Sequence, residues 1–346
     1  MKIAFNNLQT QLGPKITNGN REYLYFGGTA YLGIPQSDEF LKLYLEGLKK
    51  YGLNNGTSRG NNVQLGIYAE AEHYAAKRFG ADAALITSSG YLAAQLVIKQ
   101  LQGFGEIRYA PDTHPALWRN ERPKIYQSFD EWALNIVEEI NASSKENWVL
   151  ITNSMNNLYP NRYDFSFIKK LKKHVVVVID DSHGIGINNK GLGVFPALPK
   201  CDNVETVIVA SMAKALGVDS GVTLGAQKSC SLIKKSNEFL GASPPAAAGL
   251  YAFIHAEEIY ANSLAKLKNN MNVLAKSLAR NERWEFITDF PVYLAKNAEL
   301  SSALQQKGIL ISSFPYPDKK GPLINRIVLS SWHNELDIEE LIKALN

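Results

Sequence analysis

The sequence predicts an α/β protein whose mostly parallel sheet lies between two layers of helices. Four short runs are apolar except at their end residues, with no alternation between apolar and polar residues: residues 83–87, 148–152, 175–180 and 206–211. Strands of this kind are buried on both faces, which is typical of a parallel sheet covered by helices. Helical stretches such as residues 165–173 lie between some of these runs, so a doubly wound architecture follows.

The chain before the first apolar run is predicted to contain two helices. The first thirty residues are polar and turn-rich, and Ser37 then caps an amphipathic helical pattern. A turn rich in glycine and asparagine follows over residues 52–60. The second helix begins near Tyr68 and ends at Gly80, directly before the first strand.

The last hundred residues are predicted to form a smaller α/β domain. Pro244 and Pro245 introduce a helical region from Ala246 to about Arg280, and a final helix starts at Asn334. Short strands are predicted near residues 284–287, 292–294, 309–312 and 326–329. The predicted domains are an N-terminal arm (1–35), a large domain (36–245), and a bridging helix with a small C-terminal domain (246–346).

Composition excludes several classes of protein. The chain has 346 residues, 45% hydrophobic and 20% charged, which at ~150 residues per domain fits about two globular domains. A net charge of +4 without long basic runs gives no sign of a nucleic-acid binder. No apolar run approaches the ~18 residues of a membrane span, and the N-terminus lacks a signal-peptide core. Cys201 and Cys230 form no disulfide framework, so we expect a cytoplasmic protein.

Polar residues at strand ends are the candidates for chemistry, because ligands of parallel sheets bind beyond the carboxyl ends of the strands. Asp180 closes the run 175–179, and His183 follows it in an Asp-Asp-Ser-His segment. An exposed turn in which the aspartate caps a helix is the alternative. Lys214 follows the run 206–211 among small and apolar residues. Such surroundings lower the pKa of an amine and free its lone pair to bond a carbonyl carbon, although most lysines are solvated surface charges.

Two further segments complete the candidate set. Ser89, Gly90 and Tyr91 form a small-residue turn at a helix start, where free N–H groups can bind a phosphate. An ordinary helix cap is the alternative there. His114 lies beyond another expected strand end, and by itself it could equally be a structural histidine.

Taken in order, these segments resemble the α-oxoamine synthase group of fold-type I enzymes that depend on pyridoxal 5′-phosphate (PLP), within aminotransferase class I/II. The group includes 8-amino-7-oxononanoate synthase, glycine C-acetyltransferase and serine palmitoyltransferase. The similarity covers nearly the whole chain. Its markers are Tyr31-Leu32-Gly33, Gly56-Thr57-Ser58-Arg59, Ser88-Ser89-Gly90-Tyr91, Asp180-Asp181-Ser182-His183-Gly184, the Lys214 segment, Ser243-Pro244-Pro245, and Arg326 with His333 seven residues later.

The resemblance implies a role for each candidate residue. Lys214 would bind PLP covalently, Asp180 would pair with the pyridinium nitrogen, His183 would hydrogen-bond the phenolic oxygen, and His114 would stack on the ring. The phosphate would be held by Ser89, Gly90, Tyr91 and Ser211, and the carboxylate of the amino acid by Arg326.

Three positions depart from the family pattern. Asn157 stands where the family has a serine near the phenolic oxygen, and asparagine there is similar to the aminotransferase arrangement. Tyr68 replaces a histidine of the family, and Gly241 replaces a threonine that reaches the phosphate in the partner subunit. The chain is also some tens of residues shorter than is usual for the group.

The resemblance implies decarboxylative condensation of a small amino acid, such as glycine, alanine or serine, with an acyl-CoA. Transamination is the alternative that Asn157 leaves open, and an inactive PLP-fold binding protein is a further one. The family also implies a homodimer, to which residues 52–60 with Arg59 would be the contribution from the partner subunit.

Two unrelated classes fit the strand-end residues less well. A dinucleotide-binding dehydrogenase would use Gly184 and Gly186, but the polar residues 188–190 that follow do not begin a helix that could receive a pyrophosphate. A metal hydrolase would need Asp180 and Asp181 on one ion, yet neighbouring side chains of extended backbone point to opposite sides. We therefore predict no metal site.

Overall fold

The computed structural model describes residues 5–156, 158–279, 281–316 and 320–345. The chain divides into two compact units. The large unit contains residues 39–157 and 162–257, and the small unit contains residues 1–38, 158–161 and 258–346.

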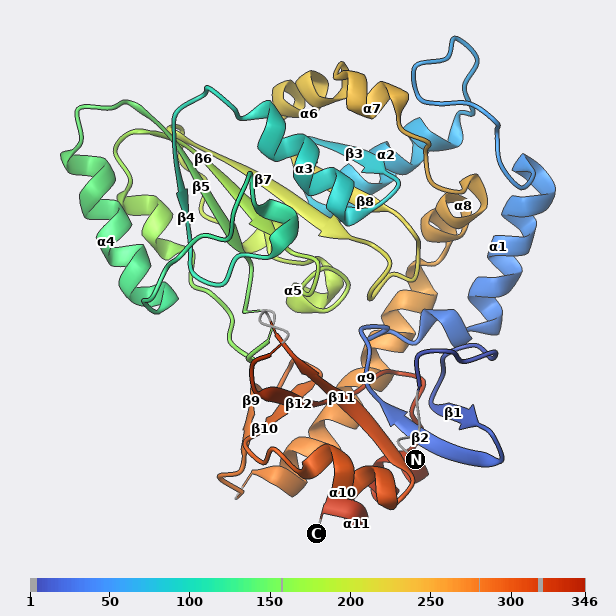
Figure 1. Cartoon of the computed structure of the whole chain (residues 1–346). Coiled ribbons are helices and arrows are strands. Elements are labelled where there is room, and N and C mark those ends of the chain that lie inside the picture. The colour runs from blue at the N-terminus through green and yellow to red at the C-terminus, as the bar shows by residue number, and fades with distance from the viewer. Residues whose placement is uncertain (1–4, 157, 280, 317–319, 346) are drawn as a thin grey trace. The chain divides into compact units, whose positions relative to one another are not determined.

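A six-stranded sheet with the order β3-β8-β7-β6-β5-β4 forms the centre of the large unit (Figure 1). Its strands are β3 (Ala83–Thr87), β4 (Glu106–Tyr109), β5 (Asn147–Asn153), β6 (His174–Asp180), β7 (Val204–Ser211) and β8 (Gly221–Gly225). Strands β4 to β7 are parallel, whereas β8 runs antiparallel to both of its neighbours, β7 and β3. The predicted mostly parallel α/β sheet is therefore confirmed.

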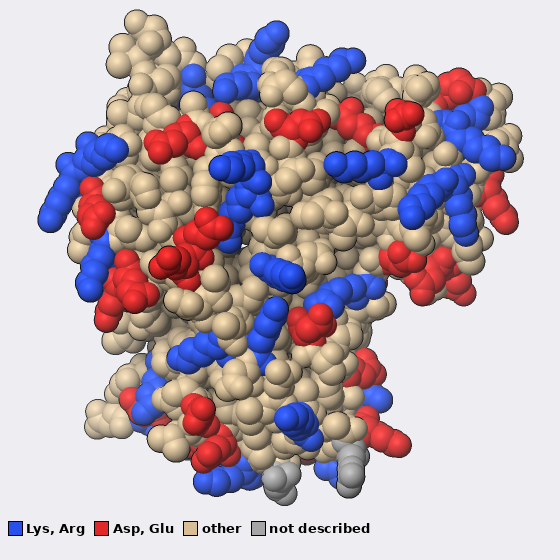
Figure 2. Space-filling model, turned by 180° about the vertical axis from the view of Figure 1, so that it is seen from behind, with Lys and Arg blue, Asp and Glu red and all other residues tan. Residues whose placement is uncertain are grey.

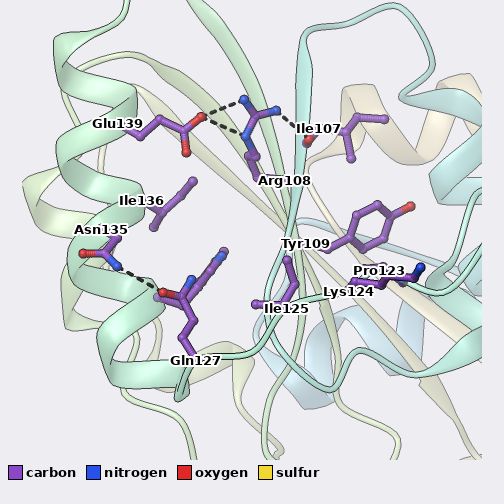
Figure 3. Close-up of a pocket in the computed structure, with 11 residues that line it drawn as sticks. Ile107, Arg108, Tyr109, Pro123, Lys124, Ile125, Gln127, Asn135, Ile136 and Glu139 are labelled. Atoms are coloured by element: carbon purple, nitrogen blue, oxygen red, sulfur yellow. Dashed lines mark hydrogen bonds and ion pairs between the residues drawn. The ribbon is translucent and has the colours of Figure 1, made fainter.

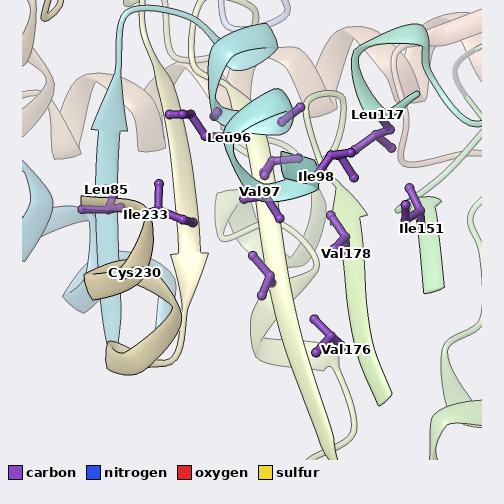
Figure 4. Close-up of a cluster of buried hydrophobic side chains, with 14 of the residues drawn as sticks. Leu85, Leu96, Val97, Ile98, Leu117, Ile151, Val176, Val178, Cys230 and Ile233 are labelled. Atoms are coloured by element: carbon purple, nitrogen blue, oxygen red, sulfur yellow. The ribbon is translucent and has the colours of Figure 1, made fainter. Parts of the chain in front are cut away.

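Helices pack on the sheet and bury its apolar strands. Figure 4 shows Val97 of α3 (Gly90–Gln100) and Ile233 of α6 (Gln227–Lys234) in one buried cluster with Val178 of β6. Every residue of β3, and all of β6 after His174, is buried. Burial on both faces explains why these strands are apolar throughout.

The remaining helices of the large unit follow local sequence signals. They are α1 (Asp38–Tyr51), α2 (Ile67–Phe79), α4 (Phe129–Ala142), α5 (Asn188–Gly191), α7 (Asn237–Gly241) and α8 (Ala247–His255), with 3₁₀ turns η2 (Pro115–Leu117), η3 (Ser166–Lys170) and η4 (Phe195–Ala197). Gly80, at φ 75°, ends α2, and Ser128 and Glu131 form a capping box at the start of α4. The helix predicted over residues 165–173 is wrong in type, since only the 3₁₀ turn η3 forms there.

A second six-stranded sheet, with the order β1-β2-β11-β12-β10-β9, forms the small unit. Its strands are β1 (Lys15–Asn18), β2 (Arg21–Phe26), β9 (Trp284–Phe286), β10 (Val292–Ala295), β11 (Ile309–Pro315) and β12 (Leu323–Val328). Strand β2 pairs in parallel with β11, so the N-terminal segment joins the C-terminal sheet. The helices are α9 (Glu257–Leu278), α10 (Leu300–Gln306) and α11 (Glu335–Leu345), with the 3₁₀ turn η1 (Ile34–Gln36).

The surface carries charges of both signs. Figure 2 shows Lys and Arg side chains interspersed with Asp and Glu over the face in view. Several form exposed ion pairs, such as Lys15 with Glu22 at 2.8 Å. Within the described part of the chain, no helix is both long enough and apolar enough to span a membrane.

Candidate active site

The carboxyl ends of β6 and β7 bring His183 and Lys214 into contact. The Nζ of Lys214 lies 3.0 Å from the Nε2 of His183, and both side chains are partly buried. Lys214 lies on the turn after β7, and the N–H of Met212 fixes this turn by donating to the carbonyl oxygen of Ser220 at 2.9 Å. An amine and an imidazole that are separated by one hydrogen-bond length can exchange a proton.

His114 lies within electrostatic range of Asp180 and Lys214. Burial is the main cause that lowers the pKa of His114, the Lys214 charge lowers it further, and the Asp180 carboxylate opposes the shift. The Nδ1 of His114 accepts a hydrogen bond from the N–H of Ala116 at 3.2 Å, so the neutral ring carries its proton on Nε2. The structure therefore gathers a neutral imidazole, a carboxylate and an amine at one edge of the sheet.

Asn153, which the sequence analysis missed, fixes the backbone of His114. Its side-chain oxygen accepts the N–H of His114 at 3.1 Å, and its amide nitrogen donates to the carbonyl oxygen of Asp112 at 2.7 Å. Asn153 is fully buried, and Asp112 has the rare positive φ of 54°. Asn153 is the last residue of β5, and this position at a strand end was the signal that could have identified it.

Asp180 and Asp181 point to different partners. The Oδ1 of Asp180 accepts the N–H of Ser182 at 2.8 Å, whereas the Oδ2 of Asp181 accepts the N–H of Val194 at 2.7 Å. The hydroxyl oxygen of Ser182 accepts the N–H of Ser211 at 2.9 Å, which ties the end of β6 to the end of β7. Within the described residues, no cluster of three or more His, Cys, Asp or Glu side chains could hold a metal ion.

The start of α3 packs closely against the end of β7 and the start of β8. Ser89 is the N-cap, and its hydroxyl oxygen accepts the N–H of Leu92 at 3.1 Å. A Cβ at Gly90 would lie 2.7 Å from the Cα of Ser211, and a Cβ at Gly221 would lie 2.2 Å from the carbonyl oxygen of Ser89. Only glycine therefore fits at both positions. The free N–H groups of the helix start and the Ser211 hydroxyl suit an anion, so these residues fit the phosphate of PLP.

Tyr91, Asn157 and Arg326 are the remaining predicted residues. The side chain of Tyr91 is 59% exposed, which agrees with a role for its backbone N–H alone. Asn157 lies outside the described residues. Arg326 lies on β12 of the small unit, where its buried guanidinium is 5.2 Å from the ring centre of Phe314. Burial raises the pKa of Tyr31 to about 12 and the Arg326 charge opposes the shift, so these two side chains are neighbours.

Arg59 is bound within its own subunit. Its Nη2 lies 2.7 Å from the Oε1 of Glu72, and both side chains are less than a tenth exposed. The guanidinium also lies over the rings of Tyr68, at 4.8 Å, and Phe239, at 5.1 Å. Arg59 thus anchors residues 52–60 to the large unit.

A separate cavity of about 330 Å³ lies between β4 and α4, at the free edge of the sheet. Figure 3 shows Arg108 and Glu139 joined across it, with Ile125 and Tyr109 nearby. Arg108 Nε donates to Glu139 Oε1 at 2.8 Å, so its charge is already paired. None of the residues predicted to hold a cofactor lines this cavity.

Comparison with known proteins identifies the class. The sequence matches the aminotransferase class I and II family over residues 42–345, and the chain belongs to this family. It is 27% identical to the 8-amino-7-oxononanoate synthase of Nitrosospira multiformis over 98% of this chain and 90% of that protein. It is 25% identical to the enzyme of the same name from Aliivibrio fischeri, over 94% and 89% of the two chains.

Solved structures show the same fold. The serine palmitoyltransferase of Sphingomonas wittichii superposes with a TM-score of 0.81 at 16% identity, over 99% of this chain and 90% of that one. The 8-amino-7-oxononanoate synthase of Francisella tularensis has a TM-score of 0.70 at 16% identity, over 93% and 96%. The serine palmitoyltransferase of S. paucimobilis, at a TM-score of 0.80 and 16% identity over 98% and 90%, contains PLP and myriocin. These structures confirm the predicted fold-type I architecture. The family match and the relatives named 8-amino-7-oxononanoate synthase, taken with this fold, confirm the resemblance to the α-oxoamine synthase group.

Proposed function

We propose that this protein is a PLP-dependent acyltransferase that condenses a small amino acid with an acyl-CoA. The reaction joins the α-carbon of the amino acid to the acyl carbonyl carbon and releases carbon dioxide and the CoA thiol. The similarity to 8-amino-7-oxononanoate synthases over almost the whole chain supports this reaction. The observation that carries the proposal is the 3.0 Å contact between Lys214 and His183, at the sheet edge where the start of α3 packs against Ser211.

The residues of the large unit supply binding and proton transfer. When bound, PLP supplies a ring that withdraws electrons from the α-carbon of the substrate. Lys214 would bind the cofactor and afterwards hold the α-proton on Nζ. Asp180 would keep the pyridinium nitrogen protonated, His183 would donate to the phenolic oxygen, and His114, held by Asn153, would cover one face of the ring.

The phosphate and the substrate carboxylate would be bound by different sets of residues. Ser89, Gly90, Tyr91 and Ser211 would hold the phosphate, which makes the large unit the cofactor-binding domain. Arg326 of the small unit would bind the amino-acid carboxylate as a bidentate pair and leave the α-proton as the group to be removed. Asn157 would lie near the phenolic oxygen.

Borohydride reduction tests the assignment of Lys214. In PLP-loaded protein, reduction should leave the cofactor covalently attached to the peptide that contains Lys214. The matched control is Lys228, on α6, which should remain unmodified. Attachment to another lysine, or to none in saturated protein, would overturn the assignment.

Product analysis tests the reaction. Purified protein with PLP, one of glycine, alanine or serine, and a panel of acyl-CoA thioesters should release free thiol and carbon dioxide together. A keto acid that accumulates with an added amino acceptor, without thiol release, would identify an aminotransferase. A protein that binds PLP but changes none of these substrates would be an inactive binding protein.

We also propose that the protein is a homodimer. Helix α1 buries only Phe40 and Gly47, while Leu41 is 53% and Leu45 is 46% exposed. Leu53, in the segment that Arg59 anchors, is 81% exposed. A second copy of the chain would cover this apolar surface. Sedimentation should show a dimer that Leu41→Asp with Leu53→Asp dissociates, and an active wild-type monomer would contradict the proposal.

We further propose that the protein works in the cytoplasm. Cys201 and Cys230 are both free, which suits a reducing compartment. Cell fractionation should recover the protein with cytoplasmic markers.

A further inference from the structure

The carboxyl of Asp181 is enclosed by residues 184–194, called the 184–194 loop, which contains the short α5 and has no assigned role. Asp181 is 1% exposed, and its Oδ2 accepts the N–H of Val194 at the far end of this loop. Its main-chain carbonyl oxygen accepts the N–H groups of Gly184 at 3.0 Å and Ile185 at 2.9 Å at the near end. One residue therefore binds both ends of the loop.

Two glycines of the loop leave room for this carboxyl. A Cβ at Gly184 would lie 2.1 Å from the Oδ1 of Asp181, and a Cβ at Gly193 would lie 2.3 Å from its Oδ2. Gly193 also has a positive φ of 73°. Since real Cβ atoms do not approach oxygen so closely, both positions require glycine, and the loop is shaped around the carboxyl.

The opposite side of the loop packs on the turn that carries Lys214. A Cβ at Gly186 would lie 2.7 Å from the Cβ of Ala215, the residue after Lys214. The N–H of Gly186 donates to the carbonyl oxygen of Gly191 at 3.0 Å, which closes the loop on itself. His183, directly before the loop, contacts Lys214. The loop therefore lies between the Asp181 carboxyl and the Lys214 turn.

From this geometry we propose that Asp181 is a positioning residue for the reaction, which acts by holding the 184–194 loop so that His183 and Lys214 keep their spacing. The inference rests on the proposed function only where it concerns catalysis. The two adjacent carboxyls then have different roles: Asp180 would bind the cofactor, and Asp181 binds the loop. Burial raises the pKa of Asp181 to about 7, which agrees with a carboxyl that acts through hydrogen bonds in a closed space.

Limited proteolysis tests the loop contact without any reaction. Lys190 is exposed on the 184–194 loop and is a trypsin site. Asp181→Ala should speed cleavage after Lys190 by about tenfold or more, since a buried hydrogen bond to a carboxyl is lost. Asp181→Asn keeps an acceptor for the N–H of Val194 and should be cleaved at nearly the wild-type rate. The matched control is Asp164→Ala, which removes an exposed carboxylate that accepts a backbone N–H at 2.9 Å.

Spectroscopy of the PLP-loaded variants tests the link to Lys214. In Asp181→Ala, the pH at which the visible cofactor band changes should shift, and kcat should fall more than KM changes; Asp181→Asn should restore both. If Asp181→Ala fails to fold, Gly184→Ala disturbs the same contact from the loop side and should give the same pattern. Unchanged cleavage, or faster cleavage with an unchanged band, would overturn the proposal. If the wild-type protein shows no acyl transfer but the cleavage results are as expected, the proposed reaction is wrong and the role of Asp181 in holding the loop stands.

Discussion

His333 should make the stability of the small unit depend on pH. Its ring is fully buried and stacks on Phe26 at a centroid distance of 4.3 Å. Its Nδ1 accepts the N–H of Ser330 at 3.1 Å, and its Nε2 lies 2.9 Å from the carbonyl oxygen of Tyr25 and 3.1 Å from the indole Nε1 of Trp332. The histidine thus joins β2 to the turn after β12, the strand that carries Arg326.

The expected magnitude follows from the pKa of His333. Burial is the main cause that lowers this pKa from 6.5 to about 4, although the hydrogen bond to Tyr25 opposes the shift. Below pH 6.5 the unfolded chain binds a proton that the folded chain does not, so acid favours unfolding. The contribution of the neutral His333 to the unfolding free energy is therefore fully present above pH 6.5. It falls by about 3 kcal/mol as the pH drops to about 4.

The assay compares wild type with His333→Asn, which keeps an acceptor for the N–H of Ser330 but cannot titrate. Urea unfolding of both proteins between pH 7.5 and 4, values chosen to bracket the two pKa values, gives the difference in unfolding free energy. Both proteins have the same carboxylates, which also titrate in acid, so the contribution of these groups to the unfolding free energy cancels in the difference. It should shrink by about 3 kcal/mol toward pH 4. A difference that stays constant with pH, or a His333 NMR signal that titrates near 6.5, would refute a neutral buried ring.

Three further experiments, two of them with a control variant, test other contacts. Asp180→Asn should abolish most turnover of PLP-loaded protein while Asp181→Asn retains it, and equal losses would contradict the division between the two carboxyls. Asn153→Asp replaces an amide donor with a carboxylate that faces a carbonyl oxygen, so kcat should fall about tenfold with a shifted visible cofactor band. Glu72→Gln leaves a buried guanidinium uncompensated and should lower the unfolding free energy by about 3–5 kcal/mol in urea titration, whereas the exposed Glu22→Gln should change it by under about 1 kcal/mol.

The sequence predicted the elements whose burial leaves a clear pattern. Strand β6 was recognised because it is apolar on both faces, and α2 was bounded because Gly80 ends it in the left-handed conformation. Strands β1 and β2 were missed. They pair with each other, and β2 also pairs with β11, almost three hundred residues later. Residues that are polar and partly exposed give no signal of such a distant partner.

Among the site residues, those that end apolar strands were predictable and those that support them were not. Asp180 and Lys214 follow buried strands directly, so their position on the sheet could be inferred. Asn153 also ends a buried strand, but its two hydrogen bonds go to a turn forty residues earlier, which periodicity cannot reveal. The end of the apolar run favoured Asp180 over Asp181 for the cofactor, but the hydrogen bond of Asp181 to Val194 could not be predicted.

Strand β8, which the sequence analysis did not predict, allows the start of α3 to pack against the end of β7. It lies between β3 and β7, and its first residue, Gly221, is opposite Thr87 on one side and Ser211 on the other. Neighbouring strands are about 4.8 Å apart, so β3 and β7 are separated by about 10 Å. The chain that leaves β3 must cross the start of β8 to bring Gly90 against Ser211, and any side chain at residue 221 would meet the Ser89 carbonyl. The antiparallel direction of β8 places its glycine at the edge where the parallel strands end, and this permits the start of α3 to reach the Lys214 strand.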